Sequence, residues 1–355
     1  MAKIQGINAV KPEHDKNYII NGDMRIAQRG TSFPAIAGST YSLDRYTNIN
    51  NTSAVFTITQ DSDVPTAIQA GYFFQNSLKI DVTTADAAVA AGDRVQIRQV
   101  IEGYNWADIA QKKFTLSFWV KATKTGTYCV SLVNNGSDRS YVAEYTINST
   151  LTWERKTITI AASPSAGGWN YTNSVGIVLS WTLMAGTNFN TTPGAWQTGN
   201  LHSTSNQVNS MDSVSNDFWL TGVMVNEGAV AAPFKLFGED FDQEFEQCRR
   251  YYMRLNSSAE REAYAVGQAI NTSDVNIVFS FPKNMRANPT VGFQSATALG
   301  LSNSAGANAS SSTIDTAVSR REGLRLRAVR TGSGLTAGDA VRVTLDEWME
   351  LSAEL

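Results

Sequence analysis

The residues that most often carry catalysis are few in this sequence. It contains two histidines, His14 and His202, and two cysteines, Cys129 and Cys248. Neither histidine lies near a nucleophile-elbow pattern such as Gly-x-Ser-x-Gly, so a catalytic triad is not indicated. Zinc-ligand spacings, a P-loop and a Gly-x-Gly-x-x-Gly motif after a strand are also missing. We therefore expect no catalytic residues and no cofactor. A structural calcium ion held by loop oxygen atoms stays an alternative, but nothing in the sequence locates a metal site.

Paired carboxylates are the remaining route to catalysis, because two of them can hydrolyse a glycosidic bond. Glu144, Asp217 and Glu227 lie on segments with strand patterns and are formal candidates. Each is better explained as a solvated strand residue or a turn former, and sequence spacing cannot place two carboxyl groups face to face. We expect no enzyme, and a glycan-cleaving depolymerase stays as an alternative.

Aromatic residues in polar loops are a stronger signal. Trp169, Asn170 and Tyr171 stand in "GGWNYTN", and Trp196 and Gln197 in "PGAWQTGN". Sugars bind by stacking apolar ring faces on flat aromatics and by pairing hydroxyls with amide side chains. These five residues are therefore the predicted glycan-binding set. The alternative interpretation is that the large rings pin long loops onto the core.

Composition limits the classes of partner. The chain has 355 residues, 42% apolar content and a net charge of −3, with 17% charged residues against roughly 25% in typical soluble domains. This balance offers no basic surface for nucleic acid or anionic lipid. No run of eighteen apolar residues and no apolar signal core occur, so we expect no membrane insertion and folding in the cytoplasm of the producing cell.

The elements that must position the loops have the period of β-strands. Residues 17–235 read as short alternating segments divided by Gly, Asn, Asp and Ser clusters, as in "KKFTLSFWVKA", "GTYCVSLV" and "RKTITIAA". This pattern predicts an all-β fold with an antiparallel β-sandwich. A long polar connection, roughly residues 182–215, is predicted between two of its strands.

The period changes at residue 240, which predicts one linking amphipathic helix over residues 239–256. Asp240 and Gln243 resemble a capping box at its start. Its apolar seam follows spacings of 4, 3, 4 and 3 and consists of Phe241, Phe245, Cys248, Tyr252 and Leu255. Such a seam suits either a helix packed on its own domain or a helix that meets copies of itself around a symmetry axis.

Alternation returns after the helix, so residues 257–355 are predicted to form a smaller C-terminal β-domain. Within it, "LSNSAGANASSST" (301–313) is of low complexity and is predicted to be an exposed loop tip. Residues 1–16 lack a strand or helix pattern and are assigned to an N-terminal arm.

Several ordered blocks resemble one known family. "NYIINGDMRIAQRGTSF" (17–33), "YSLDRY" (41–46), "FTLSFWVKA", "EFEQCRRYYMRL" and "FSFPKNMRANPTV" occur in the order seen in tail fibre and receptor-binding proteins of tailed bacteriophages and prophages. The resemblance covers about residues 17 to 355, and the closing "SAEL" also fits. Three positions differ from the family's usual residues: Ala27 stands where an aromatic is common, Met24 where Phe is usual, and Tyr46 where Trp is usual. These differences put a shared aromatic ligand position in doubt.

The resemblance implies a non-enzymatic virion protein with a jelly-roll domain similar to carbohydrate-binding modules. It implies a homotrimer, assembled in the host bacterial cytoplasm and located in the virion, with other tail or head proteins and bacterial surface polysaccharide as partners. The arm of residues 1–16 is then the candidate for virion attachment. A purely structural virion component without host recognition is the main alternative.

The 17–33 stretch itself is expected to be architectural. Asn21-Gly22 is predicted to form a turn with left-handed φ, between segments that enter the sandwich at Ile19, Ile20 and Ile26. Arg29 is predicted to form a structural ion pair with Asp44 at the sheet edge, with Arg25 as the other candidate.

Overall fold

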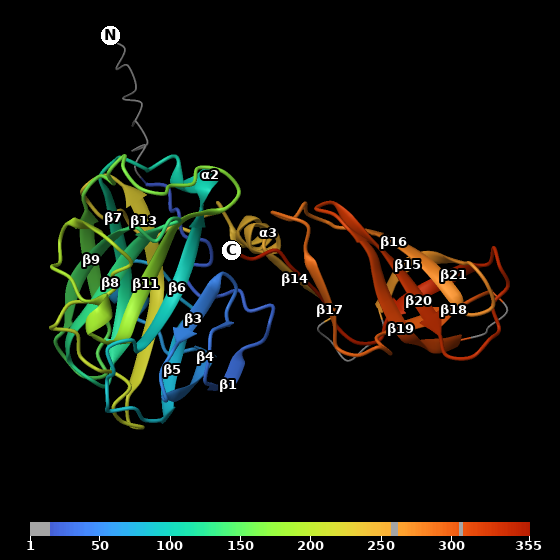
Figure 1. Cartoon of the computed structure of the whole chain (residues 1–355), viewed down its shortest axis with the longest axis horizontal. Helices are drawn as coiled ribbons and strands as arrows, with labels where there is room; N and C mark the ends of the chain where they lie inside the picture. The colour runs from blue at the N-terminus through green and yellow to red at the C-terminus, as the bar shows by residue number, and fades with distance from the viewer. Residues whose placement is uncertain (1–14, 257–261, 305–307) are drawn as a thin grey trace, which may run out of the picture. The chain divides into compact units, whose positions relative to one another are not determined.

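The computed structural model describes residues 15–256, 262–304 and 308–355. Its contacts divide the described chain into two compact units, the first comprising residues 15–27 and 31–244 and the second residues 28–30 and 245–355. The regular secondary structure of both units is mainly β-strand, which confirms the all-β prediction (Figure 1). The predicted arm lies outside the described residues except for residues 15 and 16. Within the described ranges, no helix is long and apolar enough to cross a membrane.

The first unit is a sandwich of two antiparallel sheets (Figure 1). The six-stranded sheet has the spatial order β1 (Ser32–Ile36), β4 (Val55–Asp61), β5 (Ser77–Thr84), β13 (Asp217–Glu227), β7 (Phe114–Ala122) and β10 (Glu154–Ile160). The seven-stranded sheet has the order β12 (Trp196–Thr198), β9 (Arg139–Ile147), β8 (Gly126–Asn134), β11 (Val175–Ala185), β6 (Arg94–Glu102), β3 (Tyr46–Asn50) and β2 (Thr40–Tyr41). Short helical turns connect some of them: α1 (Ala67–Ala70), α2 (Gly103–Trp106) and the 3₁₀ turn η1 (Thr187–Phe189). The polar connection is shorter than expected, because β11 reaches Ala185 and β12 adds to the sheet.

The core lies between the sheets and follows the period of two. Phe118 on β7 contacts Trp181 on β11 edge to face, with ring centroids 5.7 Å apart. The opposite face of β7 is also covered, since Trp119 is 8% and Lys121 5% exposed. The rings of Phe74 and Trp119 both come within 3 Å of the point where Gly222 would carry a side-chain carbon, so the segment before β5 shields this face.

The N-terminal turn has the predicted place, but its details differ. Ile19 enters the sandwich core, and the residues with left-handed φ are Asn21 at 59° and Met24 at 61°. Gly22 does not supply that φ. Instead, a side-chain carbon at Gly22 would lie 2.1 Å from the carbonyl oxygen of Val223, so the glycine permits close packing against β13.

The arginines of this stretch have partners within their own units. Arg25 Nε donates to Asp23 Oδ2 at 2.5 Å, and Arg29 Nη2 donates to Glu354 Oε1 at 3.2 Å. The Arg29 guanidinium also lies 3.5 Å from the ring centre of Tyr252. The ion pair between Arg29 and Asp44 stays a prediction.

The second unit contains a closed barrel and a small sheet. The barrel has the order β15 (Glu262–Ala269), β16 (Asp274–Ser280), β20 (Gly323–Arg330), β19 (Asn308–Ser319), β18 (Leu299–Ser302) and β21 (Ala340–Leu345). The three-stranded sheet has the order β14 (Tyr252–Leu255), β22 (Met349–Ser352) and β17 (Thr290–Phe293). The predicted loop tip over 301–313 is therefore wrong at both described ends, which belong to β18 and β19. Residues 305–307 lie outside the described residues.

The helix prediction needs a correction. Helix α3 spans only Phe241–Arg249, so Phe241, Phe245 and Cys248 lie on it. Tyr252 and Leu255 belong to β14, where they pair with Ser352 and Met349 of β22. Leu255 fits the seam spacing because, with Met253, it packs on the apolar core of the second unit, whereas Tyr252 lies on the other face of β14 and is buried there for a separate reason. A symmetric helical seam over 239–256 is therefore not formed.

Glu244 on α3 supplies a pH-dependent contact within the first unit. It is 1% exposed, and its carboxylate accepts hydrogen bonds from the backbone N–H groups of Asn21 at 2.5 Å and Gly238 at 2.7 Å. Burial raises the pKa of Glu244 from 4.5 to about 7; the nearby charge of Asp23 adds to this, while the backbone donors oppose it.

We expect this carboxyl to make the first unit less stable at alkaline pH. Because the pKa is higher in the folded state, its stabilising contribution is complete below the unfolded value of 4.5 and is lost as pH rises through about 7. The loss amounts to roughly 3 kcal/mol, at 1.36 kcal/mol per pKa unit. Urea unfolding at pH 4.5 and pH 8.5 measures it. Glu244→Gln should flatten the dependence; an unchanged dependence would assign it to another group.

Candidate functional site

The predicted glycan-binding aromatics lie on two connections of the sandwich. Trp169, Asn170 and Tyr171 stand between β10 and β11, whereas Trp196 and Gln197 belong to β12 at the edge of the seven-stranded sheet. Tandem glycines allow a tight approach before Trp169, since a side-chain carbon at Gly168 would lie 2.8 Å from the Cα of Gly136.

The structure brings the two predicted tryptophans into contact. The rings of Trp169 and Trp196 meet edge to face with centroids 5.7 Å apart. Trp169 also stacks on Trp106 of α2, at 5.7 Å and an interplanar angle of 20°, and Trp196 contacts Tyr141 of β9 at 5.5 Å. We call the row Trp106, Trp169, Trp196 and Tyr141 the aromatic row. Trp106 and Tyr141 are buried, whereas the two loop tryptophans are half-buried against the core.

The indole N–H groups of Trp169 and Trp196 are engaged in hydrogen bonds with backbone carbonyls, whereas Trp106 Nε1 is buried without a partner in the described structure. Trp169 Nε1 donates to the carbonyl of Ala166 at 3.1 Å, and Trp196 Nε1 donates to that of Ala161 at 2.9 Å. These bonds hold the 161–169 loop against β12. The alternative interpretation of the sequence, in which the large rings pin the loops onto the core, therefore also describes these two tryptophans. What the rings offer to a ligand is therefore their apolar surface, not their donors.

The polar members of the predicted set differ in availability. Asn170 Oδ1 accepts from the backbone N–H of Thr172 at 2.9 Å and shapes its own loop. Gln197 is half-buried opposite Ser140, and its side chain makes no hydrogen bond with the described part of the chain. Tyr171 is 39% exposed. The exposed ring and the amide of Gln197 are thus the members of the set that are most open to a ligand.

An ionised carboxylate fixes the loop that carries Trp169. Asp138 Oδ1 accepts from Asn134 Nδ2 at 2.6 Å and from the backbone N–H of Gly168 at 3.1 Å. These donors hold the pKa of Asp138 below its usual range, because they favour the charged form. The turn between β8 and β9, which carries Asp138, therefore fixes the loop that carries Trp169.

The formal catalytic carboxylates are occupied in separate places. Glu144 on β9 accepts from Thr204 Oγ1 at 2.5 Å, Asp217 lies 3.2 Å from Lys79 Nζ, and Glu227 lies 3.0 Å from Lys112 Nζ. None of the three is paired with another of the three among the described contacts. Within the described ranges, no group of three or more His, Cys, Asp and Glu is arranged to hold a metal ion.

His202 is a buried structural residue. It is 2% exposed, and its ring nitrogens lie 3.0 Å from Ser131 Oγ and 3.0 Å from Arg94 Nη1. Burial, followed by the positive charges of Arg94 and Arg98, lowers the pKa of His202 to about 3. The imidazole is therefore neutral at physiological pH. Sequence reasoning had not singled out these arginines.

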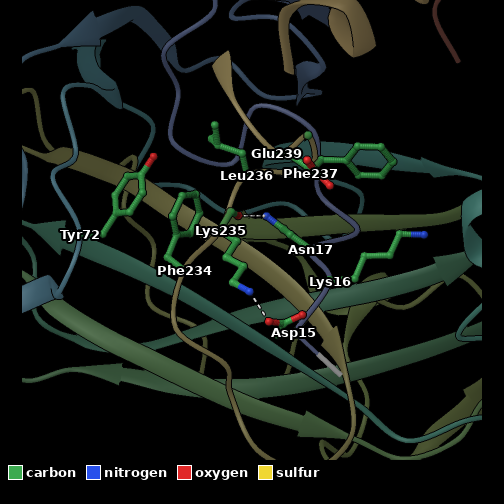
Figure 2. A pocket seen from close by; sticks show the side chains of 10 residues that line it. Asp15, Lys16, Asn17, Tyr72, Phe234, Lys235, Leu236, Phe237 and Glu239 are labelled. Carbon is green, nitrogen blue, oxygen red and sulfur yellow. Dashed lines mark hydrogen bonds and ion pairs between the residues drawn. The ribbon is translucent and has the colours of Figure 1, made fainter. Parts of the chain in front are cut away.

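A separate hollow of about 660 Å³ lies beside the N-terminal segment (Figure 2). Figure 2 shows Lys235 directed at Asp15, with which it forms an ion pair, and Lys16 Nζ lies 2.9 Å from Asp108. Tyr72 accepts from Arg25 at 2.8 Å. The hollow is lined by Asp15, Lys16, Asn17, Tyr72, Phe234, Lys235, Leu236, Phe237, Gly238 and Glu239. The Lys235–Asp15 ion pair and the hydrogen bond from Asn17 Nδ2 to the carbonyl of Lys235 at 2.9 Å hold residues 15–17 against residues 234–239.

The fold and the aromatic row define a class: an antiparallel β-sandwich with aromatic loops, followed in the chain by a small barrel. No protein-family model and no curated protein sequence matches the chain. Among solved structures, the enzymatically active domain of bacteriophage CBA120 tailspike protein 4 matches with 14% identity and a TM-score of 0.32, over 60% of this chain and 21% of that one.

Two sugar-bound modules also match. TmCBM61 in complex with β-1,4-galactotriose matches with 10% identity and a TM-score of 0.29, over 60% of this chain and 99% of that one. The family 11 carbohydrate-binding module of Clostridium thermocellum, in complex with a β-1,3-1,4-mixed-linked tetrasaccharide, matches with 10% identity and a TM-score of 0.30, over 57% and 97%. At these identities and TM-scores the likenesses carry no functional argument.

Proposed function

We propose that this chain is a virion protein, a tail fibre or receptor-binding protein, that recognises host surface glycans without catalysing a reaction and without a cofactor. The observation that carries the proposal is the contact between Trp169, on the β10–β11 connection, and Trp196, on β12, which the sequence analysis assigned to one ligand surface. The virion role rests on the ordered sequence blocks over residues 17–355, which resemble tail fibre proteins.

The chemistry of the surface suits a neutral sugar face. Apolar C–H faces of sugar rings stack on flat aromatics, and Tyr171 and the half-buried tryptophans offer such area beside the amide of Gln197. Because the indole N–H groups are already bonded, we expect stacking to supply most of the affinity at this surface, with hydrogen bonds adding orientation.

Substitution of the exposed ring tests the glycan role most cleanly. Tyr171→Ala removes a 39% exposed side chain and is expected to weaken binding to extracted host polysaccharide about tenfold, which corresponds to 1.4 kcal/mol of lost stacking. Trp196→Ala should weaken it at least as much. Trp153→Ala serves as the control, because Trp153 immediately precedes β10 of the six-stranded sheet and donates to Asp63, away from the aromatic row. Binding that is unchanged in both test variants would contradict the proposal.

We also propose a homotrimer, following the same resemblance. Light scattering of the purified chain should then give three times the single-chain mass of 38.6 kDa. A mass of one chain would contradict it.

A structural virion component is the second candidate. The bonds from Trp169 and Trp196 to their own loop carbonyls support it, since they pin the loops whether or not a glycan binds. An image of the particle separates the two candidates: residues 165–200 packed against a neighbouring subunit favour the structural role, and free tips favour glycan recognition.

A further inference from the structure

Strand β6 presents two arginines on the outer face of the seven-stranded sheet. Val95 and Ile97 point into the sandwich core, so Arg94, Gln96 and Arg98 lie on the opposite face by strand alternation. Arg98 stands directly across from Ser180 of β11. We call Arg94, Gln96, Arg98 and Ser180 the arginine face.

The positive charges of this face have no acidic partner in the described chain. Arg98 makes no side-chain hydrogen bond or ion pair there, and its Nε is buried without a partner. Burial and the charge of Arg94 both lower the pKa of Arg98, and the only opposing influence comes from Tyr41. Arg94 contacts neutral His202 and lies 4.8 Å from the ring centre of Phe189, and its Nε also lacks a partner.

Neutral polar atoms beside the arginines are also unsatisfied. Gln96 and Ser180 are both 0% exposed, yet Gln96 Oε1 and Ser180 Oγ have no hydrogen-bond partner in the described structure. The Ser180 hydroxyl can donate, so the site combines two guanidinium groups with a hydroxyl donor. Partly buried charges and buried polar atoms without partners cost stability, and proteins retain such arrangements where a ligand completes them.

We propose that the arginine face binds the carboxylate of an acidic saccharide, such as a uronic acid unit of a bacterial surface polysaccharide. A guanidinium offers paired N–H donors that match the two oxygens of a carboxylate, and removal from bulk water strengthens the pair. The saccharide class rests on the proposed glycan-recognition function, whereas the preference for an oxyanion rests on the arginine face itself.

Calorimetric titration tests the proposal with three probes: a six-unit oligomer of galacturonic acid, a neutral glucose oligomer of the same length, and inorganic phosphate. We expect the acidic oligomer to bind, with Arg98→Gln and Arg94→Gln each weakening it at least about tenfold. Arg155→Gln is the matched control, because Arg155 is an exposed arginine on β10 of the other sheet. Equal binding of acidic and neutral oligomers, or binding of phosphate alone, overturns the proposal.

Thermal unfolding of Arg98→Met supplies a readout that separates a ligand site from a structural role. Removal of an uncompensated, partly buried charge should leave Tm unchanged or raise it, while binding of the acidic oligomer is lost. A fall in Tm of several degrees would assign Arg98 to the fold and overturn the proposal.

If host polysaccharide binding depends on Tyr171 but not on Arg98, glycan recognition stands and the acidic class fails. If the galacturonic acid oligomer binds through Arg98 but host polysaccharide does not bind, the arginine site stands and the receptor role fails.

Discussion

Trp106→Ala is expected to lower the free energy of unfolding of the sandwich by about 3–5 kcal/mol, the range for loss of a buried tryptophan. Trp106 is fully buried at the end of α2, meets Phe114 edge to face at 5.7 Å, and supports Trp169 from below at 5.7 Å. Its removal creates a cavity within the aromatic row, between Phe114 and Trp169. Chemical denaturation of the purified chain measures the loss.

The same variant links the core to the candidate site. Because Trp169 stacks on Trp106, the 161–169 loop should lose its fixed position, and binding of host polysaccharide should fall even at temperatures where the variant is folded. Tyr104→Ala is the control, since Tyr104 lies on the same short helix and is 56% exposed. A loss below about 1 kcal/mol would mean that the site collapses around the missing ring.

The sandwich could be predicted because period-two alternation is a local property of each strand. In β7 the residues that alternate inward are those of the observed core. The burial of Trp119 and Lys121 on its other face could not be predicted, because their cover comes from distant segments such as the one that carries Phe74. Alternation tells which face a residue occupies, but not what lies above it.

At the end of α3, the local apolar pattern continues beyond the helix that it predicts. Spacings of 4 and 3 residues extend to Leu255 in the sequence, yet the helix stops at Arg249, and Tyr252–Leu255 pairs with β22. Apolar residues near the junction satisfy both periods, so the pattern could not locate the boundary. The partner strand lies about one hundred residues later in the chain and leaves no local signal.

The candidate site was only partly predictable for a similar reason. Loop aromatics flanked by amides are visible in sequence, and their meeting follows from the adjacency of β12 to the sandwich edge. Arg94 and Arg98 were not predicted as site residues, although the alternation in "RVQIRQV" is visible in the sequence. What makes those arginines unusual is the absence of an acidic partner in the described surroundings, and this is a property of the assembled sheet.

Asn21→Asp is expected to lower the free energy of unfolding of the first unit by at least about 4 kcal/mol at pH 7, although the side chains are nearly equal in size. Asn21 is fully buried with φ of 59°, and its Nδ2 donates to the carbonyl oxygens of Ile26 and Asp44, both at 2.9 Å. Its Oδ1 accepts from the N–H of Ile26 at 2.9 Å. A carboxylate keeps the acceptor but turns the donor into a second acceptor that faces two carbonyls.

Each carbonyl left without its donor costs about 1–3 kcal/mol, and an ionised carboxylate buried among acceptors adds a desolvation cost. The introduced acid should therefore have a raised folded pKa, so the variant should regain stability as pH falls and a protonated oxygen can donate again. Urea unfolding at pH 5 and pH 8 measures both effects. Asn51→Asp, the same change at an exposed position, should cost little. Equal losses in the two variants would show that the hydrogen bonds of Asn21 do not hold the turn, and the architectural role of "NYIINGDMRIAQRG" would have to rest on Gly22 and the buried isoleucines alone.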